Sequence, residues 1–245
     1  MRVPTAKSVL LKTDLLTITV SADFRAHQAR MAVFFENTSR FDIQNLKVTV
    51  TTVATSAGSI NVKQQDPSVR VSPGEETKLQ LALESARPFP DAYPLEMAVH
   101  FTISGSAYSY PLLLPVTAAS FFEALPCDKA TYMARWKSLD GTDAEAQQVF
   151  ACGRPVDAAL LTQLRTVLVP AMKLGLAEGL DNERTITGTA SFLTGTAGPD
   201  GKPISVGVMM RLEADPAQGK FRITARAKNA LVAQGLKNFL VHQLS

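Results

Sequence analysis

The chain has 245 residues, of which 46% are hydrophobic and 19% are charged, and its formal net charge is +3. This composition is ordinary for one or two globular domains, and the near balance of charge gives little support to general binding of nucleic acids or membrane surfaces. Cys127 and Cys152 belong to no CxxC or Cys/His cluster, so we expect two reduced thiols in a cytosolic protein and no zinc site. Pro4 and Lys7 stand where a signal peptide needs an apolar stretch, and no run of about 18 apolar residues predicts a membrane span.

Short extended runs separated by turns fill residues 8–118. The predicted strands are residues 15–21, 30–35, 46–53, 58–62, 77–83, 96–103 and 108–116. Alternation supports them, because Leu79, Leu81 and Leu83 fall on one face of a strand. About seven strands in about 110 residues is the number that an immunoglobulin-like sandwich needs. We therefore predict an all-β immunoglobulin-like sandwich over residues 1–118.

The pattern changes near residue 119, where helix caps and a period near 3.6 begin. Predicted helices run from an Asp128 N-cap to Leu139, from a Thr142/Glu145 capping box to the residue before Gly153, from an Asp157 N-cap to Pro170, and from an Asn229 N-cap to Leu244. Predicted strands are 172–174, 184–193, 204–213 and 220–227, with turns at Gly198-Pro199-Asp200-Gly201 and Asp215-Pro216. Residues 119–245 are thus predicted to be an α+β unit, an antiparallel sheet with helices on one side or at its ends.

The sequence offers no motif for catalysis. His27, His100 and His242 are far apart and belong to no HExxH motif or other metal-ligand spacing, and neither a phosphate-binding loop nor a GxGxxG fingerprint occurs. We therefore expect a protein that is not an enzyme and that uses no cofactor and no metal. The alternative is an enzyme whose carboxylates come from distant parts of the chain, which a motif search does not detect.

Two charged strands near the end of the chain form the best candidate surface. Alternation puts Met209, Arg211 and Glu213 on one face, opposite Lys220, Arg222, Thr224 and Arg226, while Val208, Met210, Leu212, Phe221 and Ile223 face the core. If Glu213 pairs with Lys220, then Arg211 lies across from Arg222. That like-charge pair is unfavourable unless an anion relieves it, so we expect a ligand carboxylate there. The alternative is a solvated polar face.

Four stretches resemble the C-terminal appendage, or ear, domain of the α-adaptin family, and the first of them, Ser8 to Asn37, contains two parts. Leu16 to Arg25 has the form L-x-I-x-apolar-x-small-acidic-aromatic-R, and Arg30 to Asn37 follows as an aromatic strand. Further matches are Leu114-Pro115-Val116-Thr117 with Phe121-Phe122, Tyr132 to Lys137 with its tryptophan, and Met210 to Pro216. The matches follow the family's order over nearly the whole chain. The appendages of β-adaptin and of coatomer γ are the alternatives within membrane trafficking.

The resemblance implies a sandwich followed by a platform subdomain that binds short linear motifs of endocytic accessory proteins, namely Asp-Pro-Phe, Asp-Pro-Trp and Phe-x-Asp-x-Phe. It implies a cytoplasmic location at clathrin-coated pits of the plasma membrane, with other adaptor subunits and the membrane reached only through a trunk and hinge that this chain lacks. No nucleic-acid partner is expected, because a binding platform would need exposed aromatic residues or a basic stripe.

The resemblance also implies two peptide sites. The platform site consists of Trp136, Met133, Arg211, Glu213, Arg222 and Arg226, in which Trp136 supports a peptide phenylalanine and guanidinium groups hold its aspartate. Met133 stands where the family usually has phenylalanine. A second site on the sandwich consists of Phe34, Glu36 and Asn37, in which Glu36 replaces a residue that is commonly small. The alternatives are a core stripe of Tyr132, Trp136 and Leu139, and buried sandwich aromatics.

Overall fold

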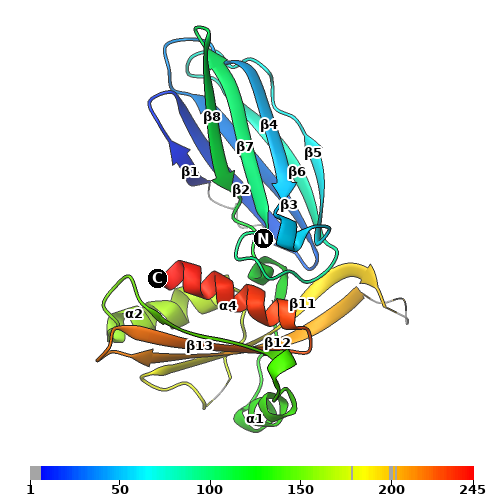
Figure 1. The fold of residues 1–245 in the computed structure, drawn as a ribbon, viewed down its shortest axis with the longest axis vertical. Coiled ribbons are helices and arrows are strands. Elements are labelled where there is room, and N and C mark those ends of the chain that lie inside the picture. Colours follow the sequence, from blue (N-terminus) through cyan, green and yellow to red (C-terminus); the bar gives the residue numbers. More distant parts are fainter. Residues whose placement is uncertain (1–6, 178, 199–200, 202) are drawn as a thin grey trace, which may run out of the picture. The chain divides into compact units, whose positions relative to one another are not determined.

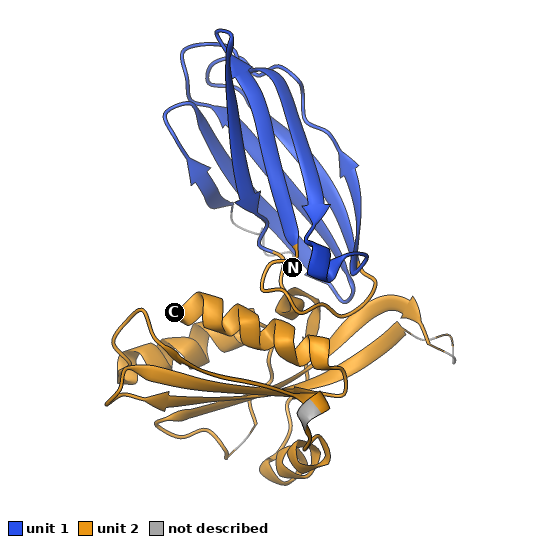
Figure 2. Cartoon of the chain, in the orientation of Figure 1, with its two compact units in different colours: residues 1–84, 95–115 blue, residues 85–94, 116–245 orange. Residues whose placement is uncertain are grey.

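The computed structural model describes residues 7–177, 179–198, 201 and 203–245. The chain divides into two compact units (Figure 2), unit 1 with residues 1–84 and 95–115, and unit 2 with residues 85–94 and 116–245. The sequence-based division after residue 118 differs from this in two ways: the units divide after residue 115, and the segment 85–94 between two sandwich strands belongs to unit 2. The predicted turn at 198–201 includes residues 199–200, which lie outside the described residues.

Unit 1 is the predicted immunoglobulin-like sandwich (Figure 1). One sheet has the order β1 (Ser8–Lys12), β2 (Leu16–Arg25), β3 (Gln28–Asn37), β6 (Glu76–Ser85) and β5 (Ile60–Gln65), and the other has β4 (Gln44–Thr52), β7 (Leu95–Ile103) and β8 (Ser106–Leu113). The order β2-β3-β6-β5 against β4-β7-β8 is that of a constant-type immunoglobulin domain. Every predicted strand of this unit corresponds to an observed one, and the edge strand β1 was not predicted.

Strict alternation builds the sandwich core. Leu16, Ile18 and Val20 on β2 are buried, as are Leu79, Leu81 and Leu83 on β6 of the same sheet. The predicted turn at residues 72–75 is present: the amide of Glu75 donates to the carbonyl of Ser72 at 3.0 Å, and Gly74 adopts φ +75°. Glycine tolerates this left-handed conformation without steric cost.

Unit 2 is an antiparallel sheet with helices, as predicted. The strand order is β10 (Glu145–Ala151), β13 (Lys220–Ala227), β12 (Pro203–Asp215), β11 (Thr185–Ala197) and β9 (Phe122–Ala124). Helix α4 (Ala230–Leu244) covers one face of this sheet (Figure 1). Helix α1 (Lys129–Ser138) lies on the opposite face, which we call the outer face. The short elements are η1 (Ala54–Ser56) in unit 1 and η2 (Ala118–Phe121), η3 (Thr142–Ala144), α2 (Ala158–Gln163), η4 (Leu164–Leu168) and α3 (Val169–Ala171) in unit 2. No helix among the described residues is both long and apolar enough to cross a membrane.

The three aspartate and asparagine N-caps are confirmed. Asp128, Asp157 and Asn229 each accept a hydrogen bond from a backbone amide in the first turn, at 2.7, 2.8 and 3.0 Å. The bond from the Thr131 amide lowers the pKa of Asp128. The prediction that Pro170 stops the third helix is off by one residue: the helix runs through α2, the π-helical turn η4 and α3 and ends at Ala171. Within η4 the amide of Val169 bonds to the carbonyl of Leu164. The wider turn accommodates a residue that has no N–H to donate.

Two other predictions in this unit are wrong. Residues 145–151 form strand β10 rather than a helix, because they pair with β13 from Glu145↔Arg226 to Ala151↔Lys220. Ala146 and Phe150 face the core, so the segment has period 2. Residues 172–174 form a turn rather than a strand, with Lys173 at φ 52° and the amide of Leu174 bonded to the carbonyl of Val169.

The segment 85–94 completes the core of unit 2. Phe89 is fully buried, and its ring lies edge-on at 6.4 Å from that of Phe121 and 6.0 Å from that of Phe192. The side chain of Asn238 on α4 donates to the carbonyl of Pro90 at 2.7 Å. A Cβ atom at Gly235 would lie 2.6 Å from the carbonyl oxygen of Phe89. The glycine therefore allows α4 to approach this segment closely.

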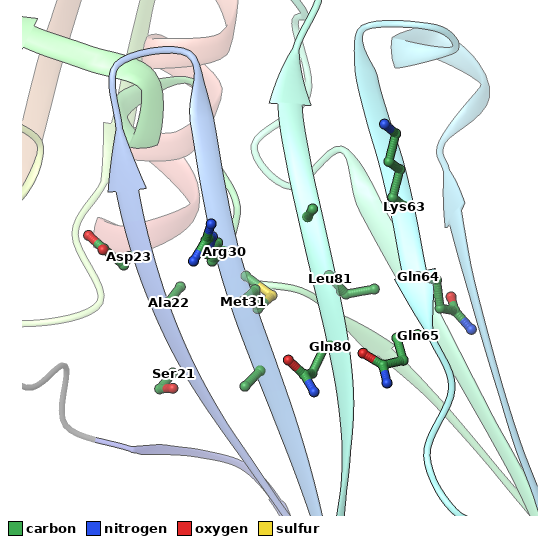
Figure 3. A pocket seen from close by; sticks show the side chains of 12 residues that line it. Ser21, Ala22, Asp23, Arg30, Met31, Lys63, Gln64, Gln65, Gln80 and Leu81 are labelled. Carbon is green, nitrogen blue, oxygen red and sulfur yellow. The ribbon is translucent and has the colours of Figure 1, made fainter.

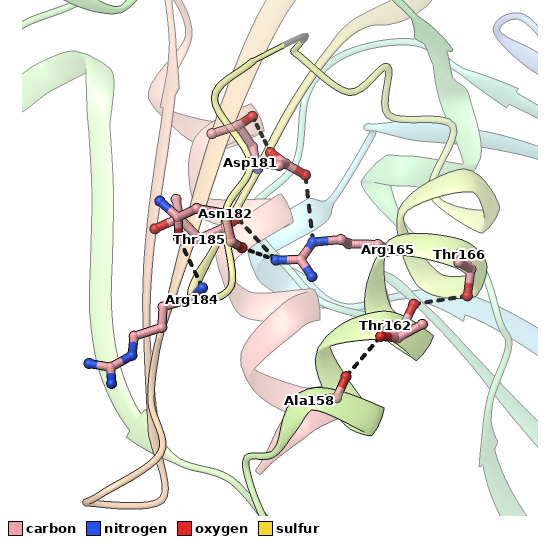
Figure 4. Close-up of polar contacts among 9 residues, drawn as sticks. Ala158, Thr162, Arg165, Thr166, Asp181, Asn182, Arg184 and Thr185 are labelled. Carbon is pink, nitrogen blue, oxygen red and sulfur yellow. Dashed lines mark hydrogen bonds and ion pairs between the residues drawn. The ribbon is translucent and has the colours of Figure 1, made fainter.

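A polar cluster fixes the loop that leads into β11 (Figure 4). The guanidinium of Arg165 on η4 donates to the carbonyls of Asn182 and Thr185, and Asp181 accepts from the amide of Thr187 at 2.8 Å and from its hydroxyl at 2.7 Å. Arg165 Nε and Asp181 Oδ2 lie 3.8 Å apart as an ion pair, too far for a hydrogen bond. The cluster anchors the loop that presents Ala177 and Leu180 to α1.

Candidate functional site

Helix α1 is attached to the outer face of the unit 2 sheet through a small core of its own. Tyr132, Ala177 and Met209 are its buried members, and Cys127, Trp136, Leu139 and Leu180 pack around them half-buried. The Tyr132 hydroxyl donates to the carbonyl of Met210 at 2.9 Å, and burial raises the pKa of Tyr132. The stripe of Tyr132, Trp136 and Leu139 is thus partly core, as the alternative interpretation had it. Met133 is exposed and is not part of this small core.

Trp136 lies against two side chains of its own unit. Its ring stacks on that of Tyr132, with centroids 5.6 Å apart and planes 14° apart, and the guanidinium carbon of Arg226 lies 4.5 Å from the ring centroid. Arg226 also donates to the Trp136 carbonyl at 2.8 Å, to Glu145 at 2.7 Å and to Asp140 at 3.0 Å. Three elements therefore meet at Arg226, namely β13, β10 and the end of α1.

Glu213 joins the two other arginines of the predicted platform site. Its carboxylate lies 2.8 Å from Arg211 Nη2 and 2.6 Å from Arg222 Nη2, and Arg222 Nε donates to it at 2.7 Å. The predicted register is wrong by two residues along the strand, since Glu213 lies opposite Arg222 rather than Lys220, and Arg211 lies opposite Thr224. The two arginines are therefore not directly opposite each other. The carboxylate of Glu213, which belongs to the chain itself, contacts both guanidinium groups.

The strand register arranges these side chains in rows beside α1. The first row is Met209, Arg226 and Glu145, the second is Arg211, Thr224 and Gln147, and the third is Glu213, Arg222 and Val149. Successive rows on one face are about 7 Å apart. The five predicted core residues, Val208, Met210, Leu212, Phe221 and Ile223, are all buried. On the opposite face Met209 and Thr224 are buried as well, whereas Arg211 and Arg222 are exposed.

The result is an open strip with an apolar end and a cationic end. Met133 and Trp136 belong to α1, and Arg211 and Arg222 keep 45% and 49% of their side-chain surface exposed although both touch Glu213. A guanidinium has five N–H donors, so one shared carboxylate leaves donors on each arginine available to a ligand. This geometry can accept an extended segment that carries an apolar side chain and a carboxylate.

The predicted sandwich site is less complete. Phe34 faces outward from β3, and Lys7 Nζ lies 3.6 Å from its ring centroid while also donating to both carboxylate oxygens of Glu76. Glu36 is exposed and lies directly opposite Glu76. Asn37 is fully buried, and its amide donates to the carbonyls of Phe41 and Val71 and accepts from Ser39. Asn37 therefore belongs to the fold of the sandwich and is not available to a ligand.

A hollow of about 510 Å³ lies on the same outward face of this sheet as Phe34, which does not itself line it (Figure 3). Its floor includes Ala32 and Ala82, and its rim carries polar side chains such as Arg30, Lys63 and Gln80. Small residues in the floor leave the sheet backbone close to solvent. The hollow can hold a peptide side chain, although its walls are mostly the ends of flexible side chains.

Within the described ranges, no three His, Cys, Asp or Glu side chains gather as metal ligands. The histidines that have a described partner lie in separate places: His27 is 3.9 Å from Glu84 in unit 1, and His242 packs on the ring of Tyr93 in unit 2.

Sequence reasoning missed two acidic residues of the site. Glu145 and Asp140 bind Arg226, yet Glu145 was interpreted as part of a helix capping box. The signal that could have found Glu145 is its alternation with Gln147 and Val149, the outward positions of a strand. Asp140 lies in the connection after α1, where no periodicity marks a contact.

Comparison with known proteins settles the family. The family model described as "Alpha adaptin AP2, C-terminal domain" matches residues 120–244, and the model "Adaptin C-terminal domain" matches residues 6–109. The chain belongs to the α-adaptin C-terminal family. It is an appendage domain in which the sandwich and the platform subdomain correspond to the two models.

Curated relatives agree along nearly the whole chain. An AP-2 complex subunit alpha-2 of Dictyostelium discoideum is 23% identical over 240 residues, which cover 98% of this chain and 23% of that protein. An AP-2 complex subunit alpha-2 of Arabidopsis thaliana is 21% identical over 238 residues, covering 96% of this chain and 22% of that protein. The chain thus spans less than a quarter of the length of these relatives. A solved GAE domain of GGA2p from Saccharomyces cerevisiae is a distant match, with 16% identity and a TM-score of 0.39. The match covers 45% of this chain and 96% of that domain.

Proposed function

We propose that the outer face of the unit 2 sheet, beside α1, binds short peptide motifs of endocytic accessory proteins. The motifs are Asp-Pro-Phe, Asp-Pro-Trp and Phe-x-Asp-x-Phe, and binding recruits their owners to clathrin-coated pits without any catalytic step. Through the trunk of a longer subunit, the appendage would act within an adaptor complex at the cytoplasmic side of the plasma membrane. Membership of the α-adaptin family supports this role.

The observation that carries the proposal is the shared carboxylate between Arg211 and Arg222. Glu213 holds the two half-exposed guanidinium groups together. Arg211 lies one row and Arg222 two rows away from Arg226, which contacts Trp136. A peptide aspartate can bind the free N–H donors, and an aromatic side chain four or fewer residues away along an extended peptide can reach Met133 or Trp136. Such a short flexible ligand binds weakly, because its ordering offsets much of the contact energy.

Titration calorimetry with a Phe-x-Asp-x-Phe peptide tests the proposal. Replacing Arg222 or Arg211 by alanine should weaken binding by roughly 1–3 kcal/mol, through loss of a charge-assisted hydrogen bond. Arg154→Ala is the matched control, because Arg154 is an exposed arginine of unit 2 that bonds to Gln163 rather than to the strip. Each variant needs an unchanged thermal transition. Folded Arg211 and Arg222 variants that bind as tightly as the parent would refute the platform site.

A second peptide site of the Trp-x-x-Phe type on the sandwich is also proposed, and it is more restricted than the sequence implied. Phe34 and the hollow on the same sheet face support it, with Glu36 at its border and without Asn37. Titration of the Phe34→Ala variant with a Trp-x-x-Phe peptide and with a Phe-x-Asp-x-Phe peptide distinguishes the two sites, because only the Trp-x-x-Phe peptide should bind more weakly than to the parent.

A further inference from the structure

Arg226 differs from the other arginines of the platform in where its donors point. Its side chain is 13% exposed, against 45% and 49% for Arg211 and Arg222. Each of its three nitrogens already has an acceptor within unit 2: Nε donates to Glu145, Nη1 to the Trp136 carbonyl and Nη2 to Asp140. A guanidinium used in this way has little left to offer to a ligand.

The acceptors of Arg226 lie on two separate parts of unit 2. Glu145 is the cross-strand neighbour of Arg226 on β10, whereas the Trp136 carbonyl and Asp140 belong to the last turn of α1 and the connection after it. The fully buried part of the apolar attachment of α1 is Tyr132, one turn before Trp136, whereas Trp136 and Leu139 pack against it half-buried. Arg226 therefore fastens the end of α1 that carries Trp136 to the edge of the sheet.

Helix α1 needs such a fastening. It has 10 residues, and isolated helices shorter than about 12 residues are marginal in water. Only Tyr132 among its residues is buried, so its small core with Ala177 and Met209 is the other main anchor. The position of Trp136 relative to Arg211 and Arg222 is accordingly a property of the docked helix, not of the sheet alone.

We infer that Arg226 is a positioning residue, which acts on ligand binding by holding Trp136 beside the arginine strip rather than by touching the peptide. The effect on binding rests on the proposed function, whereas the effect on α1 does not. Arginine is required, because the planar fork serves three acceptors in different directions and at the same time lies over the indole ring. A lysine at this position would keep the charge but could not bridge the same acceptors.

The experiment measures α1 without any ligand and then measures binding. Trp136 is the only tryptophan of the chain, so acrylamide quenching of its fluorescence reports the exposure of this one side chain. Amide hydrogen exchange of residues 129–138 reports the docking of the helix backbone. The variants are Arg226→Ala, Arg226→Lys and Glu145→Ala, with Arg222→Ala as the matched control on the same face of β13.

We expect Arg226→Ala and Arg226→Lys to raise both the quenching of Trp136 and the exchange of α1, and to weaken binding of the Phe-x-Asp-x-Phe peptide about tenfold, because a misplaced anchor loses its packed contact. Glu145→Ala should shift the same readouts in the same direction to a smaller extent. Arg222→Ala should weaken binding and leave quenching and exchange as in the parent. The thermal transition of the α4-covered core should stay close to that of the parent in every variant.

Two results would overturn the inference. If Arg226→Ala loses the peptide while quenching and exchange stay unchanged, then Arg226 contacts the ligand directly. If quenching and exchange rise while affinity is unchanged, then the position of Trp136 does not matter for binding. Should Arg226→Ala fail to fold, Arg226→Lys and Glu145→Ala decide by the same criteria. If the parent binds no peptide, the proposed function fails, and the quenching and exchange data still test whether Arg226 holds α1.

Discussion

The outer faces of the two sheets use similar residues in opposite arrangements. On the platform, Arg211 and Arg222 share the single carboxylate of Glu213. On the sandwich, Glu36 and Glu76 lie opposite each other, and the single ammonium of Lys7 binds Glu76. An approaching carboxylate therefore finds spare donors on the first face and meets carboxylates of the chain on the second. The two faces therefore differ in the ratio of donors to acceptors in direct contact rather than in the presence of charge, and in the proposed function this ratio favours an acidic peptide on the platform.

The two faces also differ in how an aromatic side chain is held. Trp136 comes from a helix docked on the sheet and is enclosed by Tyr132 and Arg226, whereas Phe34 stands on a strand beneath a lysine. A docked helix creates a step on an otherwise flat sheet, and a peptide side chain can pack against that step. A strand residue alone offers only its own exposed surface.

Removing the aromatic residue from each face gives the largest expected contrast. Trp136→Ala should weaken binding of a Phe-x-Asp-x-Phe peptide by about 2 kcal/mol or more, since aromatic anchors dominate such interfaces. Phe34→Ala should change the affinity for the same peptide by less than about 0.5 kcal/mol, because that ring lies in the other unit. Calorimetry on both variants, after a check of folding, measures the contrast. Equal losses would mean that the comparison assigns the peptide to the wrong face.

The buried hydroxyl of Tyr132 makes the platform sensitive to alkaline pH. A tyrosine in the unfolded chain ionises near pH 10, and burial raises the pKa of Tyr132 above that. Below about pH 10 both states are neutral and the contribution of the residue is complete. As the pH rises towards the folded pKa, the free energy of unfolding falls by up to about 1.4 kcal/mol per pH unit.

Urea unfolding of the parent and of Tyr132→Phe, followed by Trp136 fluorescence, measures this loss. The phenylalanine variant should be less stable by about 1 kcal/mol at neutral pH, because the bond to the Met210 carbonyl is missing. Above about pH 10 its free energy of unfolding should fall less steeply with pH than that of the parent. Tyr93, whose pKa is also raised by burial, is retained in both proteins and serves as the internal reference. Parallel pH profiles for parent and variant would contradict the prediction.

The smallest expected effect concerns the facing carboxylates of the sandwich. Glu36→Ala should raise the stability of unit 1 by about 0.2–1 kcal/mol, because like charges directly opposite each other on neighbouring strands repel. Glu96→Ala on β7 is the control, since Glu96 lies across from Thr51 and Leu113 rather than from a charge. Thermal unfolding measures both variants. A Glu36→Ala protein less stable than the Glu96→Ala control would show that Lys7 already neutralises the pair.

Most of the fold was predictable because alternation and capping are local. The strands of unit 1 follow from residues such as Leu79, Leu81 and Leu83, and the N-caps at Asp128, Asp157 and Asn229 follow from side chains that need only their own first turn. The error at residues 145–151 has the same origin. Thr142 and Glu145 have the spacing of a capping box, but the pairing of β10 with β13 is a long-range interaction that outweighs a local preference.

The platform site was predictable in its residues but not in its contacts. The faces of β12 and β13 follow from period 2, whereas the register depends on where the turn begins. The strands continue to the pair Asp215↔Lys220, with the amide of Gln218 bonded to Asp215, so Glu213 lies opposite Arg222. Asp140 and Glu145 reach Arg226 from segments more than 80 positions earlier, and no short pattern encodes that meeting.

The excursion of residues 85–94 makes unit 2 discontinuous in sequence. The chain leaves the sandwich after β6, places Phe89 in a ring cluster with Phe121 and Phe192, and returns to form β7. A gene fragment that starts at residue 116 would encode all strands and helices of the platform but would lack this plug, and α4 would keep an uncovered cavity beside Gly235. On the ribosome, the plug emerges long before the sheet that encloses it, so the platform can close only after its last helix has been synthesised. A single cut in the chain therefore cannot separate the complete platform from the sandwich.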